Sequence, residues 1–210
     1  MIITPATPPV APDPVPLLDR GLAVFPLPPG QKAAAPGWQH TIVTSRSGLA
    51  AWPAGANIGI ACRASGIVGI DLDRHTTGGA NAGVDGVAQF TELCERWEQP
   101  RPVTLEVATP HDGRHLLFRV PPGLLVASVS GGTSRLGPGI DIRGPGRTLG
   151  GYLAGPGSIV DGRTYTVVVD VPITPLPAWL TALIARRPQP DQAPAPAPRP
   201  RPRTATDELN

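Results

Sequence analysis

The stretch GIVGIDLDRH (residues 66–75) is the feature that most limits how this chain can fold. Its aliphatic residues predict a strand, and the side chains of a strand alternate between the two faces of a sheet. Val68, Ile70 and Leu72 therefore share one face, while Asp71 and Asp73 share the other face with Ile67 and Gly69. Two neighbouring carboxylates are costly to desolvate without a cation. The face that carries them needs water, a basic partner or a metal ion.

Two later segments, RHLLFRV and GIDIRG, show the same alternation. In each of them, acidic, histidine or arginine side chains lie opposite an apolar face. If the three strands belong to one sheet, their polar sides gather at one open site. The residues of this predicted polar face are Asp71, Asp73, His115, Arg119, Asp141 and Arg143.

Short strands and a few helices alternate along the chain, with connections of hairpin length. We expect strands at residues 21–27, 57–62, 66–73, 102–109, 114–120, 139–144, 150–160 and 164–171. Helices are expected at residues 47–52, 83–100 and 177–187, with Asp85 as the N-cap of the second. This order predicts an α+β fold with a mixed, largely antiparallel sheet, helices on one face and an open polar face.

Proline is concentrated at the two ends of the 210-residue chain. We expect a Pro-rich segment at residues 1–15, one folded domain at 16–187, and a disordered Pro/Arg-rich tail at 188–210. No apolar run approaches the roughly 20 residues of a membrane span, and no signal-peptide pattern opens the chain. These features predict a soluble, cytoplasmic protein.

Cysteine and lysine are both scarce. Cys62 and Cys94 belong to no CxxC pattern, so we expect two small buried residues rather than a disulfide or a zinc site. Lys32 is the only lysine, and because Ala33 follows it the chain has no P-loop. A net charge of +2 permits a polyanionic partner without requiring one.

Three aspartates that converge on one point favour a hard cation such as Mg²⁺ or Mn²⁺. Two such ions at about 4 Å from each other activate the attacking and leaving oxygens of a phosphoryl displacement. Histidine and arginine beside them would bind a polyphosphate. The polar face therefore indicates nucleotidyl transfer, whereas His75 and His111 are expected in loops and form no zinc-hydrolase motif.

Four segments in this order resemble the bifunctional DNA primase/polymerase N-terminal domain, a member of the archaeo-eukaryotic primase superfamily. They are FPLPPGQKAAAPGW, NIGIACRASGIVGIDLDRH, TPHDGRHLLFRV and GIDIRGPGRTLGGYLAGPGSIVDGRTY. The resemblance runs from about Gly21 to Tyr165. It implies an open sheet with an RRM-like core.

The resemblance also implies roles for individual residues. Asp71, Asp73 and Asp141 match the family's metal ligands, which are its catalytic residues. The positions that match its nucleotide-binding motifs are Lys32, Gly113, Arg114, His115, Gly150, Gly151, Tyr152, Pro156 and Ser158, and we expect Arg119 and Arg143 to assist them. Asp112 departs from the pattern, because it stands where the family commonly has glycine, which adopts positive φ without strain.

The sequence therefore predicts a DNA primase/polymerase that uses Mg²⁺ or Mn²⁺, nucleoside triphosphates and a single-stranded DNA template, with a separate helicase as a further partner. One alternative is a replication module that binds nucleic acid or a helicase without catalysis. Another is a DxD glycosyltransferase, which would leave Asp141 and His115 without a role. Loss of all extension activity with retained DNA binding would favour the binding module.

Overall fold

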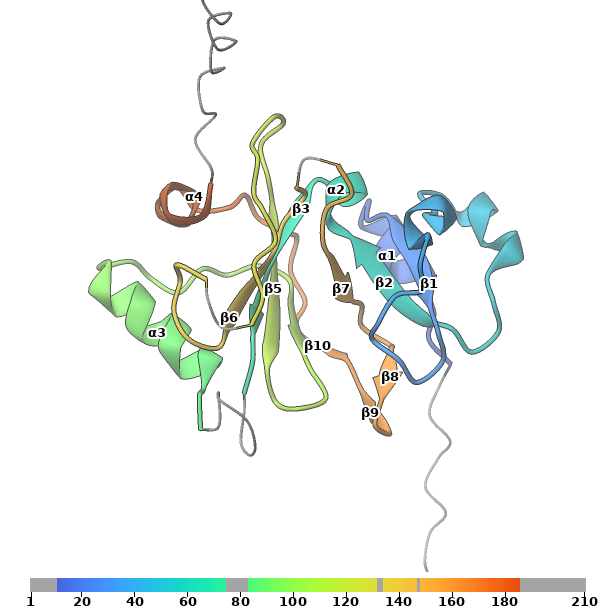
Figure 1. Cartoon of the computed structure of the whole chain (residues 1–210), viewed down its shortest axis with the longest axis horizontal. Coiled ribbons are helices and arrows are strands. Elements are labelled where there is room, and N and C mark those ends of the chain that lie inside the picture. Colours follow the sequence, from blue (N-terminus) through green and yellow to red (C-terminus); the bar gives the residue numbers. More distant parts are fainter. Residues whose placement is uncertain (1–10, 75–82, 132–133, 147, 186–210) are drawn as a thin grey trace, which may run out of the picture.

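The computed structural model describes residues 11–74, 83–131, 134–146 and 148–185. A five-stranded sheet forms its centre (Figure 1), and its neighbouring strands are all antiparallel. In spatial order the strands are β10 (Thr166–Val169), β4 (Glu106–Ala108), β5 (Arg114–Arg119), β3 (Ile67–Leu72) and β6 (Ile140–Arg143). The three strands predicted to share their polar faces are therefore neighbours, with β3 in the middle.

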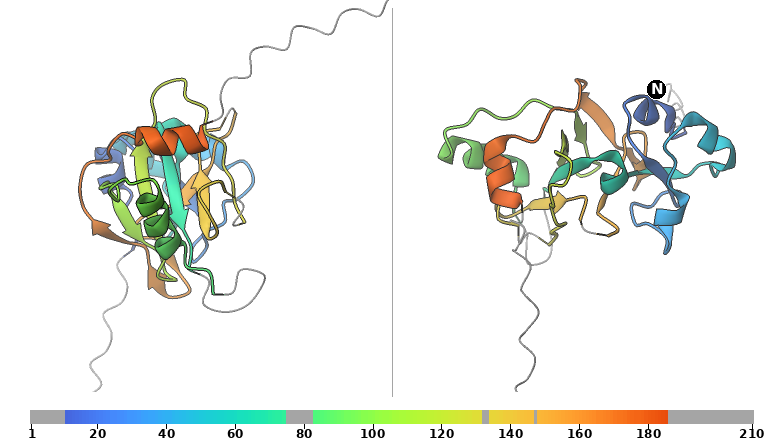
Figure 2. Two further views of the ribbon diagram at one scale, coloured as in Figure 1. Left: turned by 90° about the vertical axis from the view of Figure 1, so that its left-hand side faces the viewer. Right: turned by 90° about the horizontal axis from the view of Figure 1, so that it is seen from above.

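Two helices cover one face of this sheet, α3 (Gly86–Arg96) and α4 (Ala178–Ile184) (Figure 2). Val68, Ile70 and Leu72 of β3 face them and pack in one apolar cluster with Phe90 of α3 and Leu180 of α4. All five side chains are fully buried. The predicted apolar side of β3 is thus confirmed, and burial of this area stabilises the helices on the sheet.

A second, three-stranded antiparallel sheet packs against the opposite face. It consists of β1 (Val24–Leu27), β2 (Asn57–Ala61) and β7 (Tyr152–Ala154). The two sheets come so close that a Cβ atom on Gly69 of β3 would lie 2.3 Å from Cδ1 of Leu153. The polar face is therefore covered near the start of β3 and open only toward its end.

Shorter elements complete the chain. They are α1 (Val15–Asp19), the 3-10 helices η1 (Trp38–Thr41) and η2 (Arg46–Ala51), α2 (Cys62–Ser65), and the hairpin of β8 (Ile159–Val160) and β9 (Arg163–Thr164). The α+β class and the antiparallel pairing are confirmed. The single strand expected at 150–160 is wrong, because a turn with Gly157 at φ +88° separates β7 from β8.

Several smaller predictions have clear outcomes. Cys62 and Cys94 are free and buried, and burial raises the pKa of the Cys62 thiol to about 12. The helix expected at residues 83–100 is shorter, because Trp97 is the C-cap residue of α3 and is 44% exposed. No helix in the described ranges is both long enough and apolar enough to span a membrane. The predicted tail at 188–210 lies outside the described residues, so the domain limits stay predictions.

The start of α3 depends on Asp85, as predicted. Its carboxylate accepts hydrogen bonds from the backbone N–H groups of Val87 (2.9 Å) and Ala88 (3.0 Å), which have no partners inside the helix. Asp85 also pairs with Arg74, which follows β3. The cap therefore connects the start of α3 with the chain that leaves the open end of the polar face.

We expect Asp85→Ala to lower the free energy of unfolding by about 1 kcal/mol, since it removes the cap. Urea unfolding followed by circular dichroism measures the change. Asp85→Asn is the matched control, because asparagine caps equally well and should lose only the weak surface ion pair with Arg74. Equal losses in the two variants would contradict the capping role.

Candidate active site

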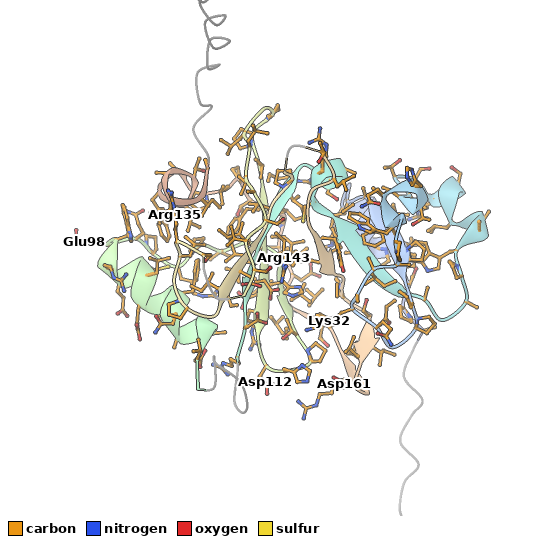
Figure 3. The ribbon with its side chains drawn as sticks, viewed as in Figure 1. Lys32, Glu98, Asp112, Arg135, Arg143 and Asp161 are labelled. Carbon is orange, nitrogen blue, oxygen red and sulfur yellow. The ribbon has the colours of Figure 1, made fainter. Side chains whose placement is uncertain are left out.

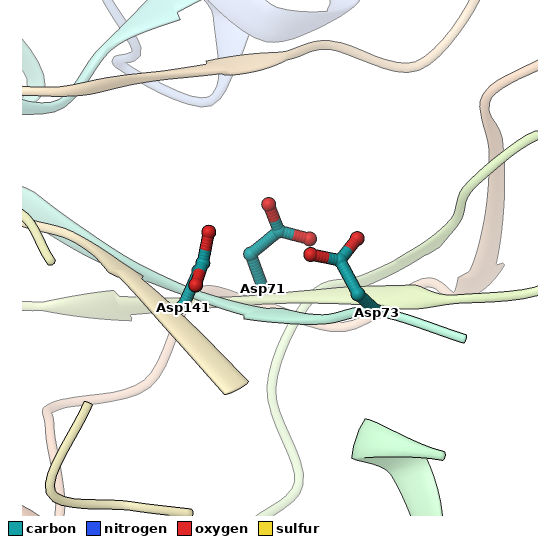
Figure 4. A group of neighbouring side chains, drawn as sticks. All are labelled: Asp71, Asp73 and Asp141. Atoms are coloured by element: carbon teal, nitrogen blue, oxygen red, sulfur yellow. The ribbon is translucent and has the colours of Figure 1, made fainter. Parts of the chain in front are cut away.

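Three carboxylates lie together at the open end of the polar face (Figure 4). Asp71 on β3 and Asp141 on β6 are direct partners across the two strands, and Asp73 follows the last residue of β3. Each offers one oxygen, and these atoms all lie within 4.8 Å of one another. Asp71 and Asp141 are buried, with exposed fractions of 8% and 4%, and Asp73 is half-buried. This group could hold a divalent metal ion.

Glycine contacts fix the position of Asp73. Its backbone N–H donates to the carbonyl of Gly139 (2.8 Å), and its carbonyl accepts from Gly86 N–H (2.7 Å). A Cβ atom on Gly86 would lie 2.1 Å from the carbonyl oxygen of Gly139. The absence of side chains at these two positions lets the starts of α3 and β6 meet at Asp73.

His115 lies on the other side of Asp71. It is the β5 partner of Asp71, and its Nε2 is 3.3 Å from Asp71 Oδ1. Its Nδ1 is buried and has no hydrogen-bond partner among the described residues. The ring centroid lies 5.5 Å from that of Tyr165. The order His115, Asp71, Asp141 across three adjacent strands thus results directly from the strand register.

Arg143 is the principal cation of this group. Its Nη2 donates to Asp141 Oδ2 at 2.9 Å and lies 3.4 Å from Asp71 Oδ2. Arg143 has this reach because it is on the same face as Asp141, two residues farther along β6, while Asp71 is the direct partner of Asp141 on β3. One guanidinium therefore bridges two of the three carboxylates.

These contacts determine the charge state of Asp71. Burial raises its pKa, but the charge of His115, the hydrogen bond from His115 and the charge and hydrogen bond of Arg143 outweigh burial and lower it. Asp71 is consequently held as a carboxylate. An ionised carboxylate is the form that binds a metal cation.

A pocket with a volume of about 460 Å³ opens above the carboxylates. Asp71, Asp73, His115 and Arg143 of the central sheet form one side of it. The opposite side comes from the second sheet and the segment before it, with Lys32, Trp38, Gly151, Tyr152 and Leu153 among its lining residues. Lys32 and Arg143, both labelled in Figure 3, line this pocket. Acidic and basic groups thus face each other across one cavity.

Tyr152 holds the segment that carries Lys32. Its hydroxyl accepts a hydrogen bond from the backbone N–H of Ala34 (2.9 Å), and its ring packs edge-on against Phe25 and Trp38. Lys32 itself is exposed, and no ion pair holds it within the described parts of the chain. Its ammonium group is therefore available to an anionic ligand.

Glycine 151 lies directly against the strand that carries Arg143. Its N–H donates to the carbonyl of Gly144 (2.7 Å), and a Cβ atom here would lie 2.3 Å from Ser128 Oγ. Gly150 before it has φ +72°. The predicted GGY element thus forms part of the pocket wall beside β6, where a side chain at either glycine would clash with neighbouring atoms.

Two arginines expected at the site lie elsewhere. Arg114 shares the helix-covered side of β5 with Leu116, and its Nε lies 3.4 Å from Glu106. Arg119 lies four residues beyond His115, about 13 Å along the strand, where it donates to the carbonyls of Ser65 and Arg20 (both 2.8 Å). Neither residue lines the pocket.

Gly113 and Ser158 also have structural surroundings rather than a place in the pocket. A Cβ atom on Gly113 would lie 2.5 Å from the carbonyl oxygen of Leu72, so glycine lets β5 begin beside the end of β3. Ser158 is fully buried, and its hydroxyl bonds to both the N–H (2.9 Å) and the carbonyl (3.2 Å) of Ile58. Asp112 has φ +63°, the conformation for which glycine is favoured.

Tyr165 and Trp38 line the pocket but were not predicted as site residues. Burial raises the pKa of the Tyr165 hydroxyl, and the charges of Asp71 and Asp73 raise it further, so the group stays a neutral donor. In the sequence, the one indication of Tyr165 was its position at the end of the last of the four segments that carry the family resemblance.

The two histidines expected in loops are not part of the acidic group. His111 lies at the rim of the pocket, 3.6 Å from Asp161, and His75 lies outside the described residues.

Comparison with known protein families gives one match. Residues 15–179 match the family model described as "Bifunctional DNA primase/polymerase, N-terminal". This range contains every strand of both sheets and all of the residues around the pocket. None of the curated proteins matches the chain significantly.

The lowered pKa of Asp71 predicts a specific acid sensitivity. A carboxyl group with a pKa below its usual 3.8 stabilises the fold above that value, and this stabilisation is lost as the pH falls through the folded-state pKa. In a metal-free buffer below about pH 4, wild-type stability should fall more steeply than that of Asp71→Asn. Urea unfolding at a series of pH values measures both curves. Parallel curves would contradict the assignment.

Proposed function

We propose that this chain, which belongs to the bifunctional DNA primase/polymerase N-terminal family, carries out metal-dependent, template-directed nucleotidyl transfer. The observation that carries the proposal is the group of three carboxylates within 4.8 Å of one another, two of which, Asp71 and Asp73, line a pocket that basic residues also line. Family membership supports the primase/polymerase class, and the geometry supports the chemistry.

The donor set fits a divalent metal ion. Asp71, Asp73 and Asp141 supply only carboxylate oxygens, the ligands that Mg²⁺ and Mn²⁺ prefer over nitrogen or sulfur. Bound there, the metal would activate the attacking 3′-hydroxyl and neutralise charge on the leaving pyrophosphate. Asp71 is held ionised by its neighbours, as that role requires.

The remaining pocket residues would bind and orient the nucleotide. Lys32 and Arg143, on opposite sides of the cavity, are two cations placed to hold a triphosphate. His115 donates to Asp71 and fixes that carboxylate, and Tyr165 provides a neutral hydroxyl beside it. Gly151, which has no side chain, lets the chain before β7 lie close to Ser128 and Arg143. The other residues expected at the nucleotide site would stabilise the fold instead; they are Gly113, Arg114, Arg119 and Ser158.

The template would bind through its phosphates to exposed arginines, so binding should weaken with salt. Aromatic residues make up only 4% of the chain, which disfavours an extended stacking surface. A separate helicase and a cytoplasmic location stay predictions of the sequence.

A glycosyltransferase with a DxD motif accounts less well for the site. It would use Asp71 and Asp73, whereas here Asp141 is the direct strand partner of Asp71 and completes the same group. The non-catalytic binding module is a stronger alternative, because Arg143 already pairs with two of the carboxylates. Activity measurements separate it from a polymerase.

Asp71→Asn and Asp141→Asn should each lower template-dependent incorporation of labelled nucleotides at least about 100-fold, because each removes a metal ligand. The assay uses Mg²⁺ or Mn²⁺ and a primed single-stranded template. Asp170→Asn is the matched control, since Asp170 is exposed, pairs with Arg20 and does not line the pocket. Wild-type DNA binding without incorporation would favour the binding module.

Lys32→Met should raise the KM for the incoming nucleotide about tenfold, the effect of one lost charge-assisted contact, with a smaller change in kcat. Steady-state kinetics on the same template measure both constants. Arg46→Met serves as control, because Arg46 is exposed, pairs with Asp19 and does not line the pocket. An unchanged KM would remove Lys32 from the nucleotide site.

A further inference from the structure

Arg143 occupies an unexpected place for a residue that binds a nucleotide. Its guanidinium contacts Asp141 and Asp71, two of the residues that would hold the metal. The side chain is 28% exposed and lines the pocket, so it lies between the acidic floor and the open cavity. It is therefore close enough to interact with either a metal site or a phosphate.

We propose that Arg143 is the internal counter-ion of the acidic group before metal binds, and that metal binding releases it toward the phosphates of the incoming nucleotide. This inference rests on the proposed function and concerns the regulation of the same site. Arg143 would thereby couple metal occupancy to nucleotide binding.

Electrostatics favours such an exchange. Asp71, Asp73 and Asp141 are buried or half-buried carboxylates within a few ångströms of one another, and their mutual repulsion is strong in a medium of low dielectric. The guanidinium relieves that repulsion, and a divalent cation would relieve it more fully. A metal ion and the guanidinium would repel each other at the same pair of carboxylates. Metal binding therefore weakens the ion pairs of Arg143 with Asp71 and Asp141.

The surroundings of Arg143 give it a second position. Its partly exposed side chain lines the pocket, and the opposite wall of the pocket carries Lys32. A guanidinium that turns from the floor into this cavity would face the same ligand as the Lys32 ammonium. Arginine suits both positions, because its planar group pairs with carboxylates and with phosphates.

The exchange has a measurable consequence for metal affinity. Because the metal must displace Arg143, the wild-type site should bind Mn²⁺ more weakly than its three carboxylates alone would. Removal of the guanidinium should therefore tighten metal binding while it weakens nucleotide binding. A residue that serves only the fold would not produce these opposite changes.

The test is Mn²⁺ binding to the full chain, measured by electron paramagnetic resonance without nucleotide or DNA. Arg143→Met should bind Mn²⁺ about tenfold more tightly than wild type, a typical size for coupling between two sites. The Mn²⁺ affinity of Arg143→Lys should lie between those of wild type and Arg143→Met, because lysine keeps the charge but lacks the planar guanidinium. Binding of a non-hydrolysable nucleoside triphosphate should weaken in Arg143→Met.

Lys32→Met is the matched control. It removes the same charge from the same pocket, but Lys32 has no ion pair with the acidic group in the described structure, so its Mn²⁺ affinity should change much less. Thermal unfolding gives a second readout that does not depend on activity. Mn²⁺ should raise the melting temperature of Arg143→Met more than that of wild type, because only the variant has lost its counter-ion.

The outcomes separate this inference from the proposed function. Equal or weaker Mn²⁺ binding in both Arg143 variants, with binding abolished by Asp71→Asn, would overturn the role of Arg143 and leave the metal site intact. A lack of Mn²⁺ binding in every variant would overturn the metal site and this inference with it. If Mn²⁺ affinity rises as much in Lys32→Met as in Arg143→Met, the cause is a general loss of positive charge. That result would also overturn the displacement of Arg143 by the metal.

Discussion

The burial of Asp71 between two partner strands is the constraint on which the rest of the site depends. A carboxylate in the middle strand of a sheet is stable only if its neighbours supply charge and hydrogen bonds. Here β5 brings His115 to one side, and β6 brings Asp141 to the other, together with Arg143. The strand register thus places two carboxylates side by side. They repel each other unless a cation is present, and together they can bind one.

The second sheet converts this row of residues into a pocket. It packs on the start of β3, where Gly69 leaves room for Leu153, and stays clear of the end, where the carboxylates lie. The same sheet and the segment before it bring Lys32 and Tyr152 to the opposite wall. An apolar contact between sheets therefore positions the cations that would meet a nucleotide.

Much of the site could be predicted because alternation along a strand is a local property. It placed Asp71, Asp141 and Arg143 on one face, and a shared sheet then brought them together. Alternation also puts Arg114 on the face of β5 opposite His115, although the family resemblance had assigned both residues to nucleotide binding. Which end of a strand stays open, and thus whether Arg119 or His115 reaches the pocket, depends on where the second sheet packs, and nonlocal packing of this kind cannot be read from local pattern. Tyr165 was missed for the same reason.

Anomalous diffraction from a crystal grown with Mn²⁺ tests the central claim most directly. The account predicts a manganese peak bounded by oxygens of Asp71, Asp73 and Asp141 at about 2.1–2.2 Å, with the Arg143 guanidinium turned away from Asp71 and Asp141. A map with no manganese at these carboxylates, and with Arg143 still bridging them at saturating Mn²⁺, would contradict it.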